Sequence, residues 1–143
     1  MSSPAPNSPA PHKPEQRALI LVVERNPIVQ RLERFFLEQT GFSIEFTEDG
    51  LTALARTQEL KPRIVVTEIL VPKLDGLNLC RRIKSSPDTR DTLVMIFSHL
   101  QAADRAREAG ADAFLAKPLD EELLIETLEK LLALRKHSVG EGT

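Results

Sequence analysis

Polar side chains that could bind a phosphoryl group or a cation follow several apolar stretches of this sequence. Glu24 and Arg25 come after ALILVV, Glu68 follows IVVT, Ser98 follows LVMIF, and Lys117 follows AFLA. Carboxylates are ligands for hard cations such as Mg²⁺, whereas hydroxyl and cationic side chains stabilise phosphate oxygens. Two carboxylates, two cations and a hydroxyl would therefore share one site, provided that the fold brings these positions together.

The spacing of apolar residues predicts such a fold, because strand and helix signals alternate along the chain. Continuous apolar runs are typical of strands buried on both faces of a parallel sheet. Asn26 and Asp120 are expected N-caps, and Asp75-Gly76 is expected to form the turn into a helix. In an α/β sheet the side chains at the carboxyl ends of the strands meet at one edge, where ligands bind. The expected strands are 18–23, 42–46, 64–67, 93–97 and 113–116, and the expected helices begin near Pro27, Leu51, Leu77, Ala102 and Asp120.

Length and composition favour a single cytoplasmic domain. The 143 residues suit one domain, and a net charge of −2 argues against nucleic-acid binding. The longest apolar run is too short to cross a bilayer. A lone cysteine, Cys80, fits a reducing compartment and is expected to be buried. We expect a disordered Pro-rich tail over 1–17, a domain over 18–136, and a disordered tail over 137–143.

Several other kinds of site are not indicated. No Gly-rich loop follows the first strand, so a nucleotide site of that type is not expected. The histidines and Cys80 lack metal-ligand spacing. Ser98 and His99 are adjacent in a strand and should point to opposite faces, which argues against a hydrolase.

Four segments in this order resemble the receiver domain of two-component response regulators: LILVVERNP, KPRIVVTEILVPKLDGL, LVMIFS and GADAFLAKP. The resemblance covers about 18–134. It implies a flavodoxin-like, doubly wound sheet of five parallel strands with five helices, and a role in bacterial signal transduction.

The resemblance also assigns roles to individual positions. In typical receivers two acids after the first strand help to hold Mg²⁺, whereas this chain has Glu24 and Arg25. The phosphate-accepting aspartate is replaced by Glu68, whose longer side chain would displace the nucleophilic oxygen. A misplacement of about 1 Å can lower a rate by about 100-fold.

In receivers some residues contact the phosphoryl group and one aromatic residue changes position in response to it, and this chain retains these residue types. Ser98 matches the hydroxyl after the fourth strand, and Lys117 matches the lysine after the fifth. Pro118 follows this lysine, and the bond between them is often cis in the family. Phe114 matches the switch aromatic.

Three hypotheses follow for this pocket. In the first, Arg25, Glu68 and Lys117 form a fixed ionic cluster that holds one state without phosphate, and two cations balance Glu24 and Glu68. In the second, the site has decayed and these side chains are solvated. In the third, a phosphate switch survives with altered Mg²⁺ geometry.

We therefore predict a stand-alone atypical receiver, not an enzyme, that acts through protein contacts without ordinary aspartyl phosphorylation. It needs no cofactor; Mg²⁺ would bind only in the alternative, a phosphorylatable single-domain response regulator. A small flavodoxin-like enzyme or ligand carrier is the second alternative. The expected partner is a histidine kinase, another signalling protein or a second copy, docked on the face of the fourth helix, fifth strand and fifth helix. Candidate contacts there are Arg105, Arg107, Glu121 and Glu122.

Overall fold

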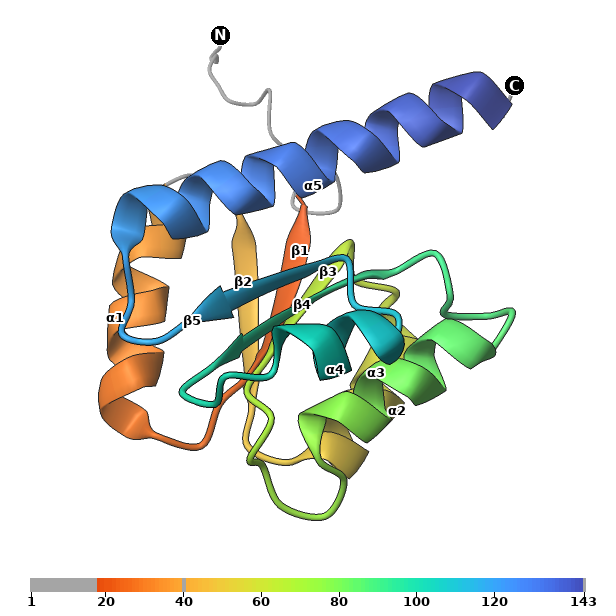
Figure 1. Cartoon of the computed structure of the whole chain (residues 1–143). Helices are drawn as coiled ribbons and strands as arrows, with labels where there is room; N and C mark the ends of the chain where they lie inside the picture. The colour runs from red at the N-terminus through yellow and green to blue at the C-terminus, as the bar shows by residue number, and fades with distance from the viewer. Residues whose placement is uncertain (1–17, 40, 143) are drawn as a thin grey trace, which may run out of the picture.

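The computed structural model describes residues 18–39 and 41–142, and five parallel strands form one sheet within them. The strand order is β2-β1-β3-β4-β5, so the chain moves outward from β1 first in one direction and then in the other (Figure 1). This is the predicted doubly wound order of flavodoxin-like folds. The strands are β1 (Leu19–Val23), β2 (Ser43–Thr47), β3 (Ile64–Thr67), β4 (Leu93–Ser98) and β5 (Ala113–Ala116).

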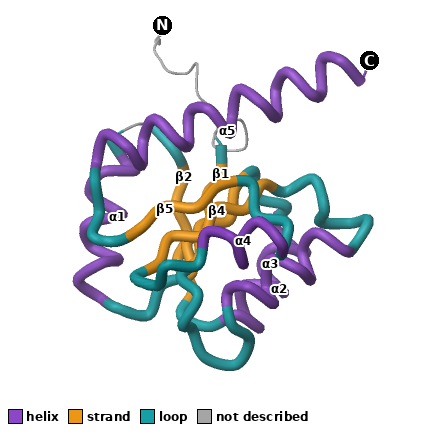
Figure 2. Tube along the Cα trace, viewed as in Figure 1, coloured by secondary structure: helices purple, strands orange, loops and turns teal. Residues whose placement is uncertain are grey.

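Helices cover both faces of the sheet (Figure 2). One face carries α1 (Pro27–Glu38) and α5 (Glu121–Gly142), and the other carries α2 (Gly50–Leu60), α3 (Gly76–Ser85) and α4 (Ala103–Glu108). The predicted fold class is confirmed. The part of the chain that the structure describes contains no helix long and apolar enough to cross a membrane.

Short polar residues start the helices as predicted. The Asn26 side chain accepts hydrogen bonds from the first turn of α1, and Asp75 accepts one from Asn78 in α3. Asp120 accepts one from the backbone N–H of Leu123 at the start of α5. Each bond satisfies a backbone N–H that the helix itself leaves without a partner.

The two chain ends are described to different extents. Helix α5 continues to Gly142, past the domain boundary that we expected at residue 136. Extending an existing helix adds one hydrogen bond per residue without a new nucleation step, which favours this continuation. The predicted Pro-rich tail, 1–17, lies outside the described residues.

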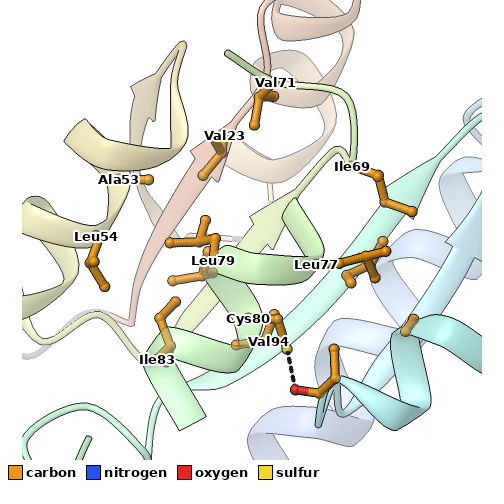
Figure 3. Close-up of a cluster of buried hydrophobic side chains, with 14 of the residues drawn as sticks. Val23, Ala53, Leu54, Ile69, Val71, Leu77, Leu79, Cys80, Ile83 and Val94 are labelled. Carbon is orange, nitrogen blue, oxygen red and sulfur yellow. Dashed lines mark hydrogen bonds between the residues drawn. The ribbon is translucent and has the colours of Figure 1, made fainter. Parts of the chain in front are cut away.

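The larger part of the core lies between the sheet and α2, α3 and α4. Figure 3 shows Leu77, Leu79, Cys80 and Ile83 of α3 packed with Val23 and Val94 of the sheet. Cys80 is buried as predicted, and its thiol donates to the backbone oxygen of Ala109 at 3.4 Å. Burial raises the pKa of this thiol to about 11, so Cys80 stays a thiol at neutral pH.

Helix α1 packs Val29 and Leu37 against the core, but the same face also carries a carboxyl residue. It buries Glu33 and Leu37, and leaves Ile28 and Phe35 about two-thirds exposed, at 64% and 62%. Leu32 is also exposed. A face spaced for core packing therefore points outward, and a carboxyl side chain points inward.

Candidate functional site

The carboxyl ends of three neighbouring strands hold the candidate site together. Parallel pairing places the ends of β1, β3 and β4 side by side, and backbone bonds extend this register past the strands. The N–H of Glu68 donates to the oxygen of Val23 at 3.1 Å. The N–H of Lys117 donates to the oxygen of Ser98 at 2.9 Å, which anchors the end of β5. The predicted convergence is thus a consequence of sheet register.

A buried ionic cluster, formed by Glu24, Glu68 and Lys117, occupies this edge. The Lys117 Nζ lies 2.6 Å from Glu24 Oε1 and 2.9 Å from Glu68 Oε2. The three side chains are 3–8% exposed. The other carboxylate oxygens are also bound: Asn26 N donates to Glu24 Oε2, and Ile69 N donates to Glu68 Oε1 at 2.6 Å. Every oxygen of both carboxylates therefore accepts a hydrogen bond from the protein.

The pKa values of Glu68 and Lys117 are shifted in the directions that keep both groups charged. Burial by itself raises the pKa of Glu68, but hydrogen bonds from Ser98 and Lys117 outweigh it, and the pKa is lowered. Burial likewise lowers the pKa of Lys117, yet its bonds to Glu24 and Glu68 leave that pKa raised. Both groups are therefore charged at neutral pH, as expected when an opposite charge lies within hydrogen-bond distance.

Gly76 allows the backbone to approach the site closely. A Cβ at this position would lie 2.3 Å from the backbone oxygen of Glu68, and the N–H of Gly76 donates to Ile69 at 2.8 Å. The start of α3 is therefore packed directly against the backbone of Glu68. The Asp75-Gly76 turn, predicted as structural, also fixes the position of Glu68.

The structure does not place Arg25 in the ionic cluster, and this part of the first hypothesis is wrong. Arg25 is exposed, and no described residue forms an ion pair or hydrogen bond with its guanidinium. It lines a cavity of about 500 Å³ together with Ile28, Leu70 and His99, and the three residues of the cluster also line this cavity. A long cationic side chain gains hydration by reaching water, whereas Lys117 already neutralises the carboxylates. Glu24 takes the place that we assigned to Arg25, and the buried cluster retains an excess of negative charge.

The remaining predicted residues occupy separate environments. Ser98 is fully buried, and its Oγ accepts from Leu100 N at 3.1 Å, whereas His99 is exposed. Strand β4 ends at Ser98, so His99 lies just outside it. Phe114 is partly buried against the larger core cluster, at a groove beside α4. The Lys117-Pro118 bond is cis.

Our sequence reasoning missed Glu33, a buried carboxyl residue of α1. It lies on α1 and is 1% exposed, and its Oε1 is buried without a hydrogen-bond donor among the described residues. Burial and the negative charge of Glu24 raise its pKa to about 8, against an ordinary 4.5. One signal was available: Glu33 is four residues before Leu37, which α1 buries.

The residues of the pocket do not fit a magnesium ion. Mg²⁺ binds carboxylate oxygens in near-octahedral geometry and keeps several waters. Here the ammonium of Lys117 lies between the two carboxylates, and the residue after Glu24 is the cationic Arg25. No group of three His, Cys, Asp or Glu side chains within 18–39 and 41–142 is arranged to hold a metal.

Comparisons with known proteins place the chain among signalling regulators by sequence similarity. The chain is 36% identical over 129 residues to the response regulator MprA of a Mycobacterium strain (KMS), covering 86% of this chain and 53% of MprA. It is 33% identical over 135 residues to the gliding motility regulatory protein of Myxococcus xanthus, covering 92% of this chain and 17% of that protein. The chain therefore spans about half or less of these relatives.

A solved structure and a family model extend the likeness to the whole sheet. The signal receiver domain of a signal transduction histidine kinase from Syntrophus aciditrophicus superposes with a TM-score of 0.76 at 31% identity. The match covers 81% of this chain and 90% of that domain. The family model of the response regulator receiver domain matches residues 20–129. With the strand order and the strand-end residues described above, these matches show that the chain belongs to the response regulator receiver domain family.

Proposed function

We propose that this receiver domain acts in signal transduction through protein contacts and holds its state without aspartyl-type phosphorylation. The observation that carries the proposal is the Lys117 ammonium bound between Glu24 and Glu68, at 2.6 and 2.9 Å. A metal ion at these carboxylates would have to displace a buried, hydrogen-bonded cation. Removing one partner from such a pair typically costs about 3–5 kcal/mol.

The same contacts reduce the nucleophilicity of Glu68. One of its oxygens accepts from Ile69 N and the other lies against Lys117, and both contacts withdraw electron density from the oxygen that would attack phosphorus. Phosphoryl transfer also depends on metal ions that neutralise developing charge. The cation of this cluster is the ammonium of Lys117, and the carboxylates of Glu24 and Glu68 already share it.

The proposal predicts a difference between the native chain and a variant with restored acids. The native protein is expected to show no saturable response to millimolar Mg²⁺ with beryllofluoride in NMR spectra, and no added phosphoryl group in intact mass after incubation with acetyl phosphate. The double variant Arg25→Asp, Glu68→Asp is expected to gain both responses. Arg31→Asp is a matched control, because Arg31 is exposed on α1.

The surviving phosphate switch is the alternative, and the same experiment separates it. A single phosphoryl group on native Glu68, together with Mg²⁺-dependent shifts at Glu24, would contradict the proposed function. A native protein that is inert beside a responsive double variant would support it. Glu68→Asp alone then shows whether the side-chain length or Arg25 limits the reaction.

The partner surface in this proposal is the face of α4, β5 and α5. A groove of about 480 Å³ lies there, lined in part by Ala103, Arg105 and Phe114. The four predicted contact residues, Arg105, Arg107, Glu121 and Glu122, are all exposed. The partner is a histidine kinase, another signalling protein or a second copy of the chain, in a bacterial cytoplasmic pathway like those in which receiver domains act. This role requires no catalytic activity of the chain.

Sedimentation velocity tests whether the partner is a second copy of the chain. Self-association that rises with concentration should be lost in the variant Arg105→Glu, Arg107→Glu and kept in Arg31→Glu. A monomer at all concentrations would exclude the homodimer, and equal association of both variants would place the contact elsewhere.

A further inference from the structure

The cavity that the ionic cluster lines has other walls, which the proposed function leaves without a role. Its volume of about 500 Å³ is typical of sites for small organic ligands. The lining residues come from the segments that follow β1, β3, β4 and β5 and from the first turn of α1. Because each segment continues directly from a strand or begins a helix, the fold itself holds the cavity open.

Two apolar side chains in the lining are unusually exposed. Leu70, which follows β3, is 66% exposed, and Ile28, in the first turn of α1, is 64% exposed. No other large apolar residue within the described part of the chain is as exposed as these two. Contact of apolar surface with water is unfavourable in proportion to its area. Ile28 and Leu70 therefore give the cavity an apolar wall that a ligand would be stabilised by covering.

The charges of the lining are separated into a negative part and a positive part. The ionic cluster contains two carboxylates and one ammonium, and its formal charge is −1. Arg25 lines the same cavity, is exposed, and forms no ion pair with a described residue. A ligand with a single charge would be attracted by one part and repelled by the other, whereas a ligand with both charges is attracted by each.

We propose that this cavity binds a small zwitterion with an apolar side chain, which is the chemistry of a free apolar amino acid. The ligand's carboxylate pairs with the guanidinium of Arg25, whose planar donors suit a carboxylate. Its ammonium group lies towards Glu68, and its apolar side chain covers Ile28 and Leu70.

This mode of binding leaves the ionic cluster intact. The two oxygens of Glu68 each accept one contact, from Ile69 N and from Lys117, and a carboxylate oxygen can accept a second. Binding is non-covalent, and no bond is made or broken. The inference deepens the proposed function and rests on it for its regulatory meaning, because the ligand then occupies the pocket in place of a phosphoryl group.

The experiment is an NMR titration of the native chain at pH 7 with leucine, isoleucine, valine, methionine and phenylalanine, without metal or phosphoryl donor. At least one of them should give saturable shifts of the Glu68 and Leu70 amide signals, with a dissociation constant below about 1 mM. The amide of that amino acid lacks the carboxylate, and its deaminated acid lacks the ammonium group. Each should bind about 10-fold or more weakly, and so should glycine, which lacks the side chain.

Variants of the lining test the same contacts from the side of the protein. Arg25→Gln should weaken binding about 10- to 100-fold, and Leu70→Ser about 10-fold. Both side chains are exposed, so neither change should unfold the chain. The matched controls are Arg31→Gln and Leu51→Ser, which replace exposed residues outside the cavity and should bind as the native chain does.

The possible results separate clearly. If none of the five amino acids binds saturably, or if Arg31→Gln weakens binding as much as Arg25→Gln, the inference is overturned. Equal or tighter binding of the deaminated acid would make this a site for anions and would also overturn it. Phosphorylation of Glu68 by acetyl phosphate with Mg²⁺ would contradict the proposed function but would leave these titrations unchanged, so the two proposals can fail separately.

Discussion

Replacing Glu33 by glutamine should remove a pH-dependent destabilisation of the fold. The pKa of Glu33 is about 8 in the folded chain against an ordinary 4.5. Between these values the unfolded chain releases a proton that the folded chain keeps, so stability falls as pH rises. The loss is about 1.4 kcal/mol per pH unit, or about 3 kcal/mol at pH 7 and about 5 kcal/mol above pH 8.

The assay is urea unfolding of the native chain, Glu33→Gln and Glu38→Gln at pH 5, 7 and 9. Buried glutamine has packing and hydrogen-bond terms of its own, but these do not change with pH. The prediction is therefore the slope: the stability difference between Glu33→Gln and the native chain should grow by about 3–5 kcal/mol from pH 5 to pH 9. Glu38 pairs with Arg34 at the surface, so its variant should follow the native curve. A Glu33→Gln curve parallel to the native one would show that Glu33 is ionised in the folded chain, and would refute the reasoning.

Three further perturbations test the structure by chemical denaturation. Lys117→Met leaves two buried carboxylates without their cation and should cost about 3–5 kcal/mol; a loss below about 1 kcal/mol would mean that water reaches the cluster. Gly76→Ala places a methyl 2.3 Å from the oxygen of Glu68, so we expect a loss of about 1–3 kcal/mol and shifted NMR signals at Glu68. Leu32→Lys should stay within about 0.5 kcal/mol of the native chain, whereas Leu37→Ala should cost about 2–5 kcal/mol. The reverse order would mean that α1 is rotated about its axis.

The strands and helices could be predicted from local patterns, because apolar runs and capping residues are features of neighbouring positions in the sequence. The third and fifth strands were predicted with the bounds that the structure shows, Ile64–Thr67 and Ala113–Ala116. Asn26, Asp75 and Asp120 begin helices because their side chains bond to N–H groups two or three residues ahead. The meeting of Glu24, Glu68, Ser98 and Lys117 at one edge was predictable as well, since it follows from strand order.

Which charged side chains form ion pairs at that edge was not predictable, because the pairing depends on where the ends of long side chains lie. Arg25 and Glu24 are adjacent in sequence, and both were expected at the site. Only the packed structure shows that Glu24 turns inward to Lys117 while Arg25 remains exposed. The choice is energetic, since the interior accepts one shared cation and a second would have to be desolvated.

The sequence by itself determined the order of elements, the polar residues at the strand ends and the caps, since each depends on neighbours along the chain. The tertiary structure decided which charges are paired and which face of α1 is buried. Glu33 shows the physical reason: Ile28, Leu32 and Phe35 are spaced as an apolar helix face and yet are exposed, whereas the carboxyl side chain of Glu33 is buried. The rotation of a helix on a sheet is set by the sum of all contacts beneath it, and a protonated carboxyl can be buried where a charged one cannot.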